Sequence, residues 1–245
     1  MLKIENAEVL GWEHAIRGMR NPKNSWAKSD SGLCHKDLCR DCITCIHKGT
    51  EYDACAAHFD VGPNDYNLMA TLRNAGTDHR KFMRMITVYL DITAPLYWWK
   101  EFDTYKVGTV ANSCSTMHKI AAKEFTLEDF SCEHLCDDEL ELLKEIINRL
   151  NMNRIVFIAK DDKRVGQYSV MSDECYAKYK KKLWWQMIQL LPSSYNQKRT
   201  VMLNYEVLAN MYKSRRNHKL DEWHTFCDWI ESLPYSELIT GKQAV

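Results

Sequence analysis

The sequence predicts a single α/β domain. Alternating apolar segments typical of strands occur in the first half of the chain, and segments with helical periodicity dominate the last third. The chain has 245 residues, enough for one large domain, and no internal repeat or long linker divides it. Its formal net charge is zero, which gives no general attraction to nucleic acid or to anionic membranes.

The N-terminal half alternates between predicted strands and helices. Asn64 or Asp65 suits the N-cap of one helix, and Gly76 follows its end as a C-terminal glycine should. Pro95 stands where the chain leaves a strand and enters the next helix. The predicted elements are strands over 1–10 and 81–92, helices over 11–19, 64–75 and 95–102, and a loop over 24–33.

The C-terminal half is predicted to be mostly helical. Thr126 precedes two acidic residues, a pattern typical of a helix start, and Pro192 and Pro234 end later helices. A charged turn over 161–170 is expected to lead into a short strand. The other predicted elements are helices over 125–150, 172–191, 200–216 and 219–233, and a short strand over 154–159.

Five cysteines and three histidines are concentrated between residues 34 and 58. Cys39, Cys42 and Cys45 are spaced closely enough to share one ion, and Cys55 or Cys34 would complete a tetrahedron. A polar segment without a core-forming pattern gains order from a metal, so we predict a structural zinc site. The alternative is a thiol-rich loop that binds no metal.

Two groups of polar side chains are candidates for a binding site. In an ideal helix, Asn204 and Arg215 lie about three turns apart on one face, with Asn210 about a third of a turn away. Buried Asn and Arg side chains need partners, which indicates a polar ligand or interface; the alternative is an exposed stripe of an amphipathic helix. The other group follows the predicted strand 81–92 and comprises Lys100, Glu101, Tyr105, Lys106, Asn112, Ser113 and Ser115.

Parts of the chain resemble the flavin-dependent thymidylate synthases. That family reads Gly-His-x-Ser-Pro-Phe-Glu-His, a strand, a Pro, Arg-Gln-x-x-Arg-His-Arg, Asn-Glu-x-Ser-x-Arg-Tyr and, far downstream, Leu-Pro and Asn-x-Arg-Ser-Leu ending in Leu-Arg. The resemblance covers residues 62–115 and 191–222. The matching positions here are Gly76 to His79, Pro95, Lys100-Glu101, Thr104 to Lys106, Asn112 to Ser115, Leu191-Pro192, Asn204, Leu208 and Arg215.

This resemblance implies a mixed or antiparallel sheet with flanking helices, and a homotetramer whose subunits share active sites built around FAD. It implies reductive methylation of dUMP or a related pyrimidine nucleotide, with methylenetetrahydrofolate and NADPH as co-substrates. Arg215 resembles the arginine that contacts the uracil, and Ser115 the serine beside the nucleotide. The residues that the resemblance places near the flavin are His79, Lys100, Glu101, Lys106, Asn112, Asn204 and Asn210.

Several motif residues are replaced. Thr104 and Tyr105 stand where an Arg and a His normally hold the flavin, and Ser113 replaces a glutamate. Met117 and Ile188 stand in the places of phosphate-binding arginines. Each charged hydrogen bond lost in this way removes about 1.5–3 kcal/mol of binding. The candidates for compensating cations are Lys119, Lys198 and Arg199.

The sequence therefore leaves alternatives to an enzyme. A catalytically silent member of the fold could serve as a nucleotide-binding or assembly protein, which the replaced motif residues favour. A zinc-dependent nucleic-acid binder built on the cysteine segment is disfavoured by the zero net charge. We expect a cytoplasmic protein, because no apolar run reaches the roughly 20 residues that span a bilayer and residues 1–12 do not resemble a signal peptide. The predicted organisation is one domain over 1–245 with insertions at 34–58 and 126–182.

Overall fold

The computed structural model describes residues 2–33, 59–159 and 172–242. These residues form two compact units. The first unit comprises Met1–Glu5, Asp91–Thr104 and Ala111–Val201, and the second comprises Asn6–Leu90, Tyr105–Val110 and Met202–Val245. The chain passes from one unit to the other within each of four strands.

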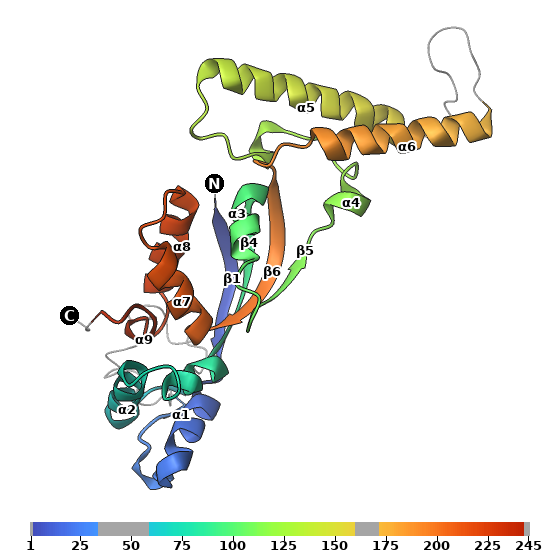
Figure 1. Ribbon diagram of the computed structural model, residues 1–245. Coiled ribbons are helices and arrows are strands. Elements are labelled where there is room, and N and C mark those ends of the chain that lie inside the picture. Colours follow the sequence, from blue (N-terminus) through green and yellow to red (C-terminus); the bar gives the residue numbers. More distant parts are fainter. Residues whose placement is uncertain (1, 34–58, 160–171, 243–245) are drawn as a thin grey trace, which may run out of the picture. The chain divides into compact units, whose positions relative to one another are not determined.

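Those four strands make an antiparallel sheet in the order β1-β4-β6-β5 (Figure 1). Strand β4 has the residue pattern of a strand with one face in a core. Every second residue from Val88 to Ala94 is buried, because successive side chains of a strand point to opposite faces of the sheet. A second, two-stranded sheet pairs β2 (Gly32–Leu33) with β3 (Phe59–Asp60). The strands of the main sheet are β1 (Lys3–Leu10), β4 (Thr87–Pro95), β5 (Val110–Ser113) and β6 (Asn196–Asn204).

The first unit has its own core around a pair of long helices. Figure 1 shows α5 and α6 running side by side, and Tyr176 and Lys180 near the start of α6 both donate to the carbonyl of Ala159 at the end of α5. The buried residues of this core include Phe125, Phe130 and Met187. The helices of the unit are α3 (Leu96–Phe102), α4 (Thr116–Lys119), η6 (Leu127–Asp129), α5 (Asp137–Ile158) and α6 (Asp173–Leu190).

The second unit packs helices around a cluster of aromatic rings. The ring of Trp12 lies edge-on to Tyr205 at 5.3 Å and to Tyr235 at 5.2 Å between centroids. Tyr205 also donates its hydroxyl to the carbonyl of Pro234 at 2.6 Å, which satisfies the one polar atom of a fully buried side chain. The elements of this unit are α1 (Trp12–Arg20), η1 (Asn21–Lys23), η2 (Trp26–Lys28), α2 (Pro63–Asn74), η5 (Arg80–Met85), α7 (Tyr205–Arg215), α8 (Asp221–Glu231) and α9 (Glu237–Thr240).

Most predicted elements are present, with shifted ends. The strand over 1–10 and the helices over 11–19, 64–75, 95–102, 172–191 and 219–233 are confirmed. The N-cap prediction for α2 is wrong: Gly62 is the N-cap, Pro63 occupies the first turn, and Asp65 is buried in an ion pair with Arg20.

Four other predictions are wrong. The strand over 81–92 begins only at Thr87, because residues 80–85 form the 3-10 helix η5. Thr126 does form a capping box, but it caps the single turn η6, and the long helix α5 starts at Asp137. The apolar run 154–159, predicted as a strand, continues that helix. The helix expected from residue 200 starts at Tyr205, after strand β6.

Strand β5 was not predicted, since all four of its residues are exposed and no apolar alternation marks it. The predicted charged turn at 161–170, the cysteine segment 34–58 and the strand expected after the turn lie outside the described residues. Within the part of the chain that is described, no helix combines the length and the apolar character that crossing a membrane requires.

Candidate functional site

Arg215 is the predicted site residue with the most distinctive surroundings. It is the last residue of α7, and its Nε donates to the hydroxyl of Tyr105 at 2.9 Å. Its guanidinium carbon lies 4.9 Å from the ring centroid of Trp223 and 5.5 Å from that of Tyr105. Cations over aromatic faces at such distances are attracted by the ring quadrupole. Two rings and one hydroxyl therefore fix this guanidinium within the second unit.

Asn204 caps a helix in the structure, and its assignment to the flavin side stays a prediction. It is the last residue of β6 and the N-cap of α7, and its Oδ1 accepts from the backbone N–H of Val207 at 3.0 Å. Its Nδ2 packs against Gly108, whose φ of +76° favours glycine and where an added Cβ would lie 2.9 Å from that nitrogen. Asn204 thus begins the helix that ends in Arg215.

Asn210 belongs to a polar cluster on one side of α7. Its Oδ1 accepts from Nη2 of Arg80 at 3.3 Å. Glu206, one turn earlier, binds Arg84 through both carboxylate oxygens and lies 3.5 Å from Nε of Arg80. We call Arg80, Arg84, Glu206 and Asn210 the Glu206 cluster; it joins η5 to α7.

The Glu206 cluster was not predicted, although the family motifs contain a signal for it. In Asn-x-Arg-Ser-Leu, the second residue after the asparagine is an arginine, and here it is Glu206. The amphipathic-stripe alternative fits Asn210, which is exposed, but not the largely buried helix that carries it.

The remaining predicted residues of the second unit, His79 and Lys106, are exposed. His79 precedes η5, and its backbone N–H donates to the carbonyl of Gly76 at 3.2 Å. Lys106 lies between α3 and β5. Their assignment to the flavin side stays a prediction.

Four predicted site residues lie in the first unit. Lys100 is exposed on α3, and Glu101 beside it is half-buried. Asn112 is exposed on β5. Ser115 is the N-cap of α4, where its Oγ accepts from the backbone N–H of His118 at 3.0 Å. The hydroxyl of Ser115 therefore has a local structural partner, and its role beside a nucleotide stays a prediction.

Two of the proposed compensating cations already have partners in the first unit. Arg199 donates to Asp103 at 2.7 Å, and its guanidinium lies 4.2 Å from the ring centroid of Trp99. Lys198 lies 3.2 Å from Asp91 and 3.4 Å from Glu5. These contacts neutralise both cations.

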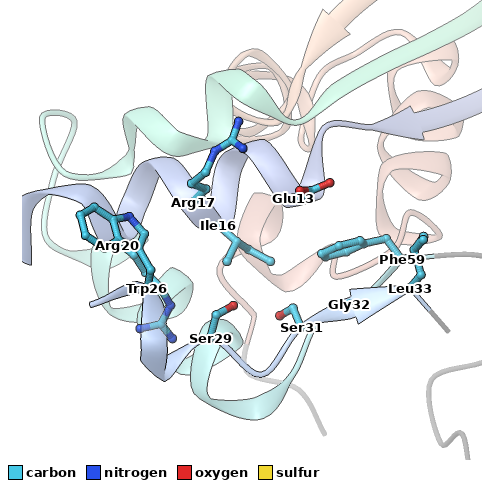
Figure 2. Close-up of a pocket in the computed structure, with 10 residues that line it drawn as sticks. All are labelled: Glu13, Ile16, Arg17, Arg20, Trp26, Ser29, Ser31, Gly32, Leu33 and Phe59. Carbon is cyan, nitrogen blue, oxygen red and sulfur yellow. The ribbon is translucent and has the colours of Figure 1, made fainter. Parts of the chain in front are cut away.

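A cavity of about 550 Å³ lies in the second unit, apart from every predicted site residue. Figure 2 shows Ile16 and Phe59 pointing into it from opposite sides. Arg20 in its wall is 3% exposed and donates to Asp65 at 2.6 Å. Its lining residues are Glu13, Ile16, Arg17, Arg20, Trp26, Ser29, Ser31, Gly32, Leu33 and Phe59.

Three polar residues of that wall, Arg20, Ser29 and Ser31, are joined through Asp65. Asp65 accepts from the hydroxyls of Ser29 and Ser31 at 2.7 and 2.6 Å and from the backbone N–H of Asp30 at 3.1 Å. Burial alone would raise the pKa of Asp65, but hydrogen bonds from Ser31, Ser29 and Arg20 outweigh it, so the pKa is lowered. We call Arg20, Asp65, Ser29 and Ser31 the Asp65 network; it holds the chain before β2 against α1 and α2.

The predicted zinc ligands Cys39, Cys42, Cys45 and Cys55 lie outside the described residues, so the zinc site stays a prediction. Among residues 2–33, 59–159 and 172–242, no three His, Cys, Asp or Glu side chains converge as a metal site would require.

Comparisons with known proteins identify the fold. No protein-family model and no curated protein matches the sequence. The structure is similar to the flavin-dependent thymidylate synthase ThyX of Helicobacter pylori, solved with FAD and dUMP, at a TM-score of 0.60 and 14% identity over 98% of both chains. It is also similar to the UMP/dUMP methylase PolB of Streptomyces cacaoi, solved with 5-Br dUMP, at a TM-score of 0.52 and 10% identity, covering 98% of this chain and 95% of PolB. The chain therefore has the fold of the flavin-dependent thymidylate synthases, with a strongly diverged sequence.

Proposed function

We propose that this chain is an FAD-dependent enzyme that methylates the uracil ring of dUMP or a related pyrimidine nucleotide. The carbon would come from methylenetetrahydrofolate and the reducing equivalents from NADPH. The observation that carries the proposal is Arg215, held by Tyr105 and Trp223 at the end of a helix that starts at Asn204. Support also comes from the two structural relatives, which were solved with dUMP and 5-Br dUMP.

The donors of the Glu206 cluster fit a flavin nucleotide. Nε of Arg80 is buried and makes no hydrogen bond to the described residues, and the side chain of Arg84 is 59% exposed. The exposed amide of Asn210 lies beside them. Guanidinium and amide groups suit the phosphates and ring carbonyls of FAD. Arg80, Arg84 and Asn210 would thus hold the cofactor in the second unit.

Bound FAD would supply the reducing equivalents of the reaction. Arg215 would donate to a uracil oxygen where negative charge develops, and its fixed orientation avoids a reorganisation cost at that moment. The thiol of Cys227 in the same unit would not attack the uracil ring. Burial raises the pKa of that thiol to about 11, so it stays protonated near neutral pH.

We further propose that the chain forms homotetramers and that α5 contributes to an interface. Met152, Ile155 and Val156 are exposed at i, i+3 and i+4, which makes a second apolar stripe opposite the buried one. Residues 137–145 of α5 are rich in acids and residues 178–182 of α6 in lysines. Because α5 and α6 are antiparallel, the acidic segment and the lysine segment lie toward opposite ends of this helix pair. Two copies packed head to tail would therefore place the acidic end of one against the basic end of the other. Light scattering should show a tetramer that Ile155→Glu dissociates.

The test of function is direct. The purified protein should carry or take up FAD, seen as flavin absorbance bands. It should then convert dUMP or UMP to the 5-methyl product when methylenetetrahydrofolate and NADPH are present. Arg215→Ala should abolish turnover and leave flavin absorbance unchanged. A protein that neither holds FAD nor turns over either nucleotide would refute the proposal.

A second candidate is a nucleotide-binding or assembly protein without catalysis. It is favoured by the segment in the Arg-His-Arg place, where Thr104 donates its hydroxyl to the carbonyl of Glu101 at 2.7 Å and Tyr105 accepts from Arg215. These side chains bind other protein groups. Calorimetric binding of dUMP without turnover at any FAD loading would select this candidate.

A further inference from the structure

The hydrogen bond between Arg215 and Tyr105 has a specific geometric effect. A guanidinium is planar, and its five N–H donors point in fixed directions. A bond of 2.9 Å from Nε to the Tyr105 hydroxyl therefore sets the directions in which both Nη groups donate. A ring contact alone would leave the guanidinium free to turn in its own plane.

Trp223 constrains the same group in another direction. Its ring is fully buried on α8, and the Arg215 guanidinium carbon lies 4.9 Å from the ring centroid. Tyr105 and Trp223 also contact each other, at 6.2 Å between centroids and an interplanar angle of 66°. A buried indole cannot shift without disturbing the core, so it supplies a rigid base for the arginine.

The chain supplies these partners from three separate places. Tyr105 lies in the segment after α3, Arg215 ends α7 and Trp223 lies in the first turn of α8. Tyr105 occupies the position of the middle residue in Arg-His-Arg, so its hydroxyl replaces an imidazole there. The phenol retains an acceptor for a guanidinium N–H, which phenylalanine would lack.

We propose that Tyr105 is a positioning residue that orients Arg215 toward the nucleotide. This inference rests on the proposed function, because Arg215 is the group that would touch the uracil. Tyr105 would act through Arg215 and make no contact with FAD of its own. The specific consequence is that its hydroxyl matters only while residue 215 carries a guanidinium.

The experiment uses the full-length protein loaded with FAD and measures kcat and KM for dUMP, with calorimetric dUMP affinity. Tyr105→Phe should lower kcat/KM about 10-fold, mainly through kcat, with flavin absorbance unchanged. Tyr105→His, which keeps an acceptor, should recover most of the loss. The matched control is Tyr89→Phe, since Tyr89 is exposed on β4, and it should leave both constants unchanged.

A double-mutant cycle makes the test strict. Arg215→Lys removes Nε and the planar fork, so adding Tyr105→Phe to it should have no further effect. Equal losses from Tyr105→Phe in both backgrounds would overturn the inference, as would an active Tyr105→Phe protein with wild-type kcat. A wild-type protein that shows neither turnover nor dUMP binding would instead overturn the proposed function, and this inference with it.

Discussion

The Asp65 network and the Glu206 cluster both join an acid to arginines in the second unit, but they differ in how completely their atoms are paired. Asp65 accepts four hydrogen bonds, and Arg20 also donates to the carbonyls of Ser25 at 3.2 Å and Lys28 at 3.1 Å. In the Glu206 cluster, Nε of Arg80 is buried and makes no hydrogen bond to the described residues, lying 3.5 Å from Glu206, and the side chain of Arg84 is 59% exposed.

This difference separates a structural network from a candidate binding site. Complete pairing in a buried place specifies one conformation and leaves no donor for a ligand. Incomplete pairing costs stability, and a ligand that supplies the missing acceptor recovers that cost. A cavity of about 550 Å³ lies beside the Asp65 network, yet the Glu206 cluster has the better chemistry for binding an anion.

The largest expected effect is on stability, from Asp65→Ala. Removing one partner of a buried ion pair strands the other, and we expect a loss of about 3–5 kcal/mol in the free energy of unfolding. Urea denaturation measures it. The control is Asp228→Ala, which breaks an exposed pair with Arg216 and should cost about 1 kcal/mol or less. Equal losses from the two variants would show that the Asp65 network is not structural.

The same network predicts that the stability of the protein depends on pH in the acid range. The pKa of Asp65 is lowered in the folded state. The contribution of its ionised carboxylate to the free energy of unfolding is therefore complete above the unfolded pKa of about 3.9 and is lost as the pH falls through the folded pKa. The stability difference between wild type and Asp65→Asn should therefore be constant near neutral pH and shrink below about pH 4. A difference that instead shrank above pH 6 would contradict this assignment.

An intermediate effect is expected when the charges of the Glu206 cluster are changed. Glu206→Arg restores the motif residue but places a third guanidinium beside Arg80 and Arg84, and the protein should lose stability. Adding Arg84→Glu should recover part of that loss, with a coupling energy of about 1–3 kcal/mol. Thermal unfolding of both single variants and the double variant gives the cycle. Purely additive losses would mean that Arg84 and Glu206 are not energetically coupled.

The smallest expected effect on stability, with a selective effect on binding, comes from Arg84→Gln. The side chain is 59% exposed, so the free energy of unfolding should change little. If Arg84 contacts FAD, the Kd for FAD should rise about 10-fold, as expected for one charged hydrogen bond. Flavin fluorescence titration measures it. The control is Arg17→Gln at the cavity beside the Asp65 network, which should leave the Kd for FAD unchanged.

The sequence was informative where one face of an element is buried. Val88, Leu90, Ile92 and Ala94 alternate in β4 and marked it as a strand, although its start was placed too early. Helix α7 is buried on almost every face, so it lacks the 3.6-residue pattern that separates a helix from the strand before it. The short apolar run 154–159 in α5 was taken for a strand for a different reason, because exposed apolar residues such as Ile155 and Val156 interrupt the helical pattern there.

The site was predictable only in part, because its contacts join distant residues. Arg215 was identified through its spacing from Asn204, but Tyr105, its partner, precedes it by 110 positions. Arg84 and Glu206 lie 122 positions apart, and neither was among the predicted site residues.

Strand β6 passes into α7 at Asn204 without a connecting loop. One inserted residue would rotate every later side chain of the helix by about 100° and shift it 1.5 Å along the axis. There is no loop in which such a change could be absorbed. During divergence, substitutions between Asn204 and Arg215 could therefore accumulate, whereas insertions and deletions would turn Arg215 away from Tyr105. The geometry therefore requires the number of residues between Asn204 and Arg215 to stay constant, even where their identities change.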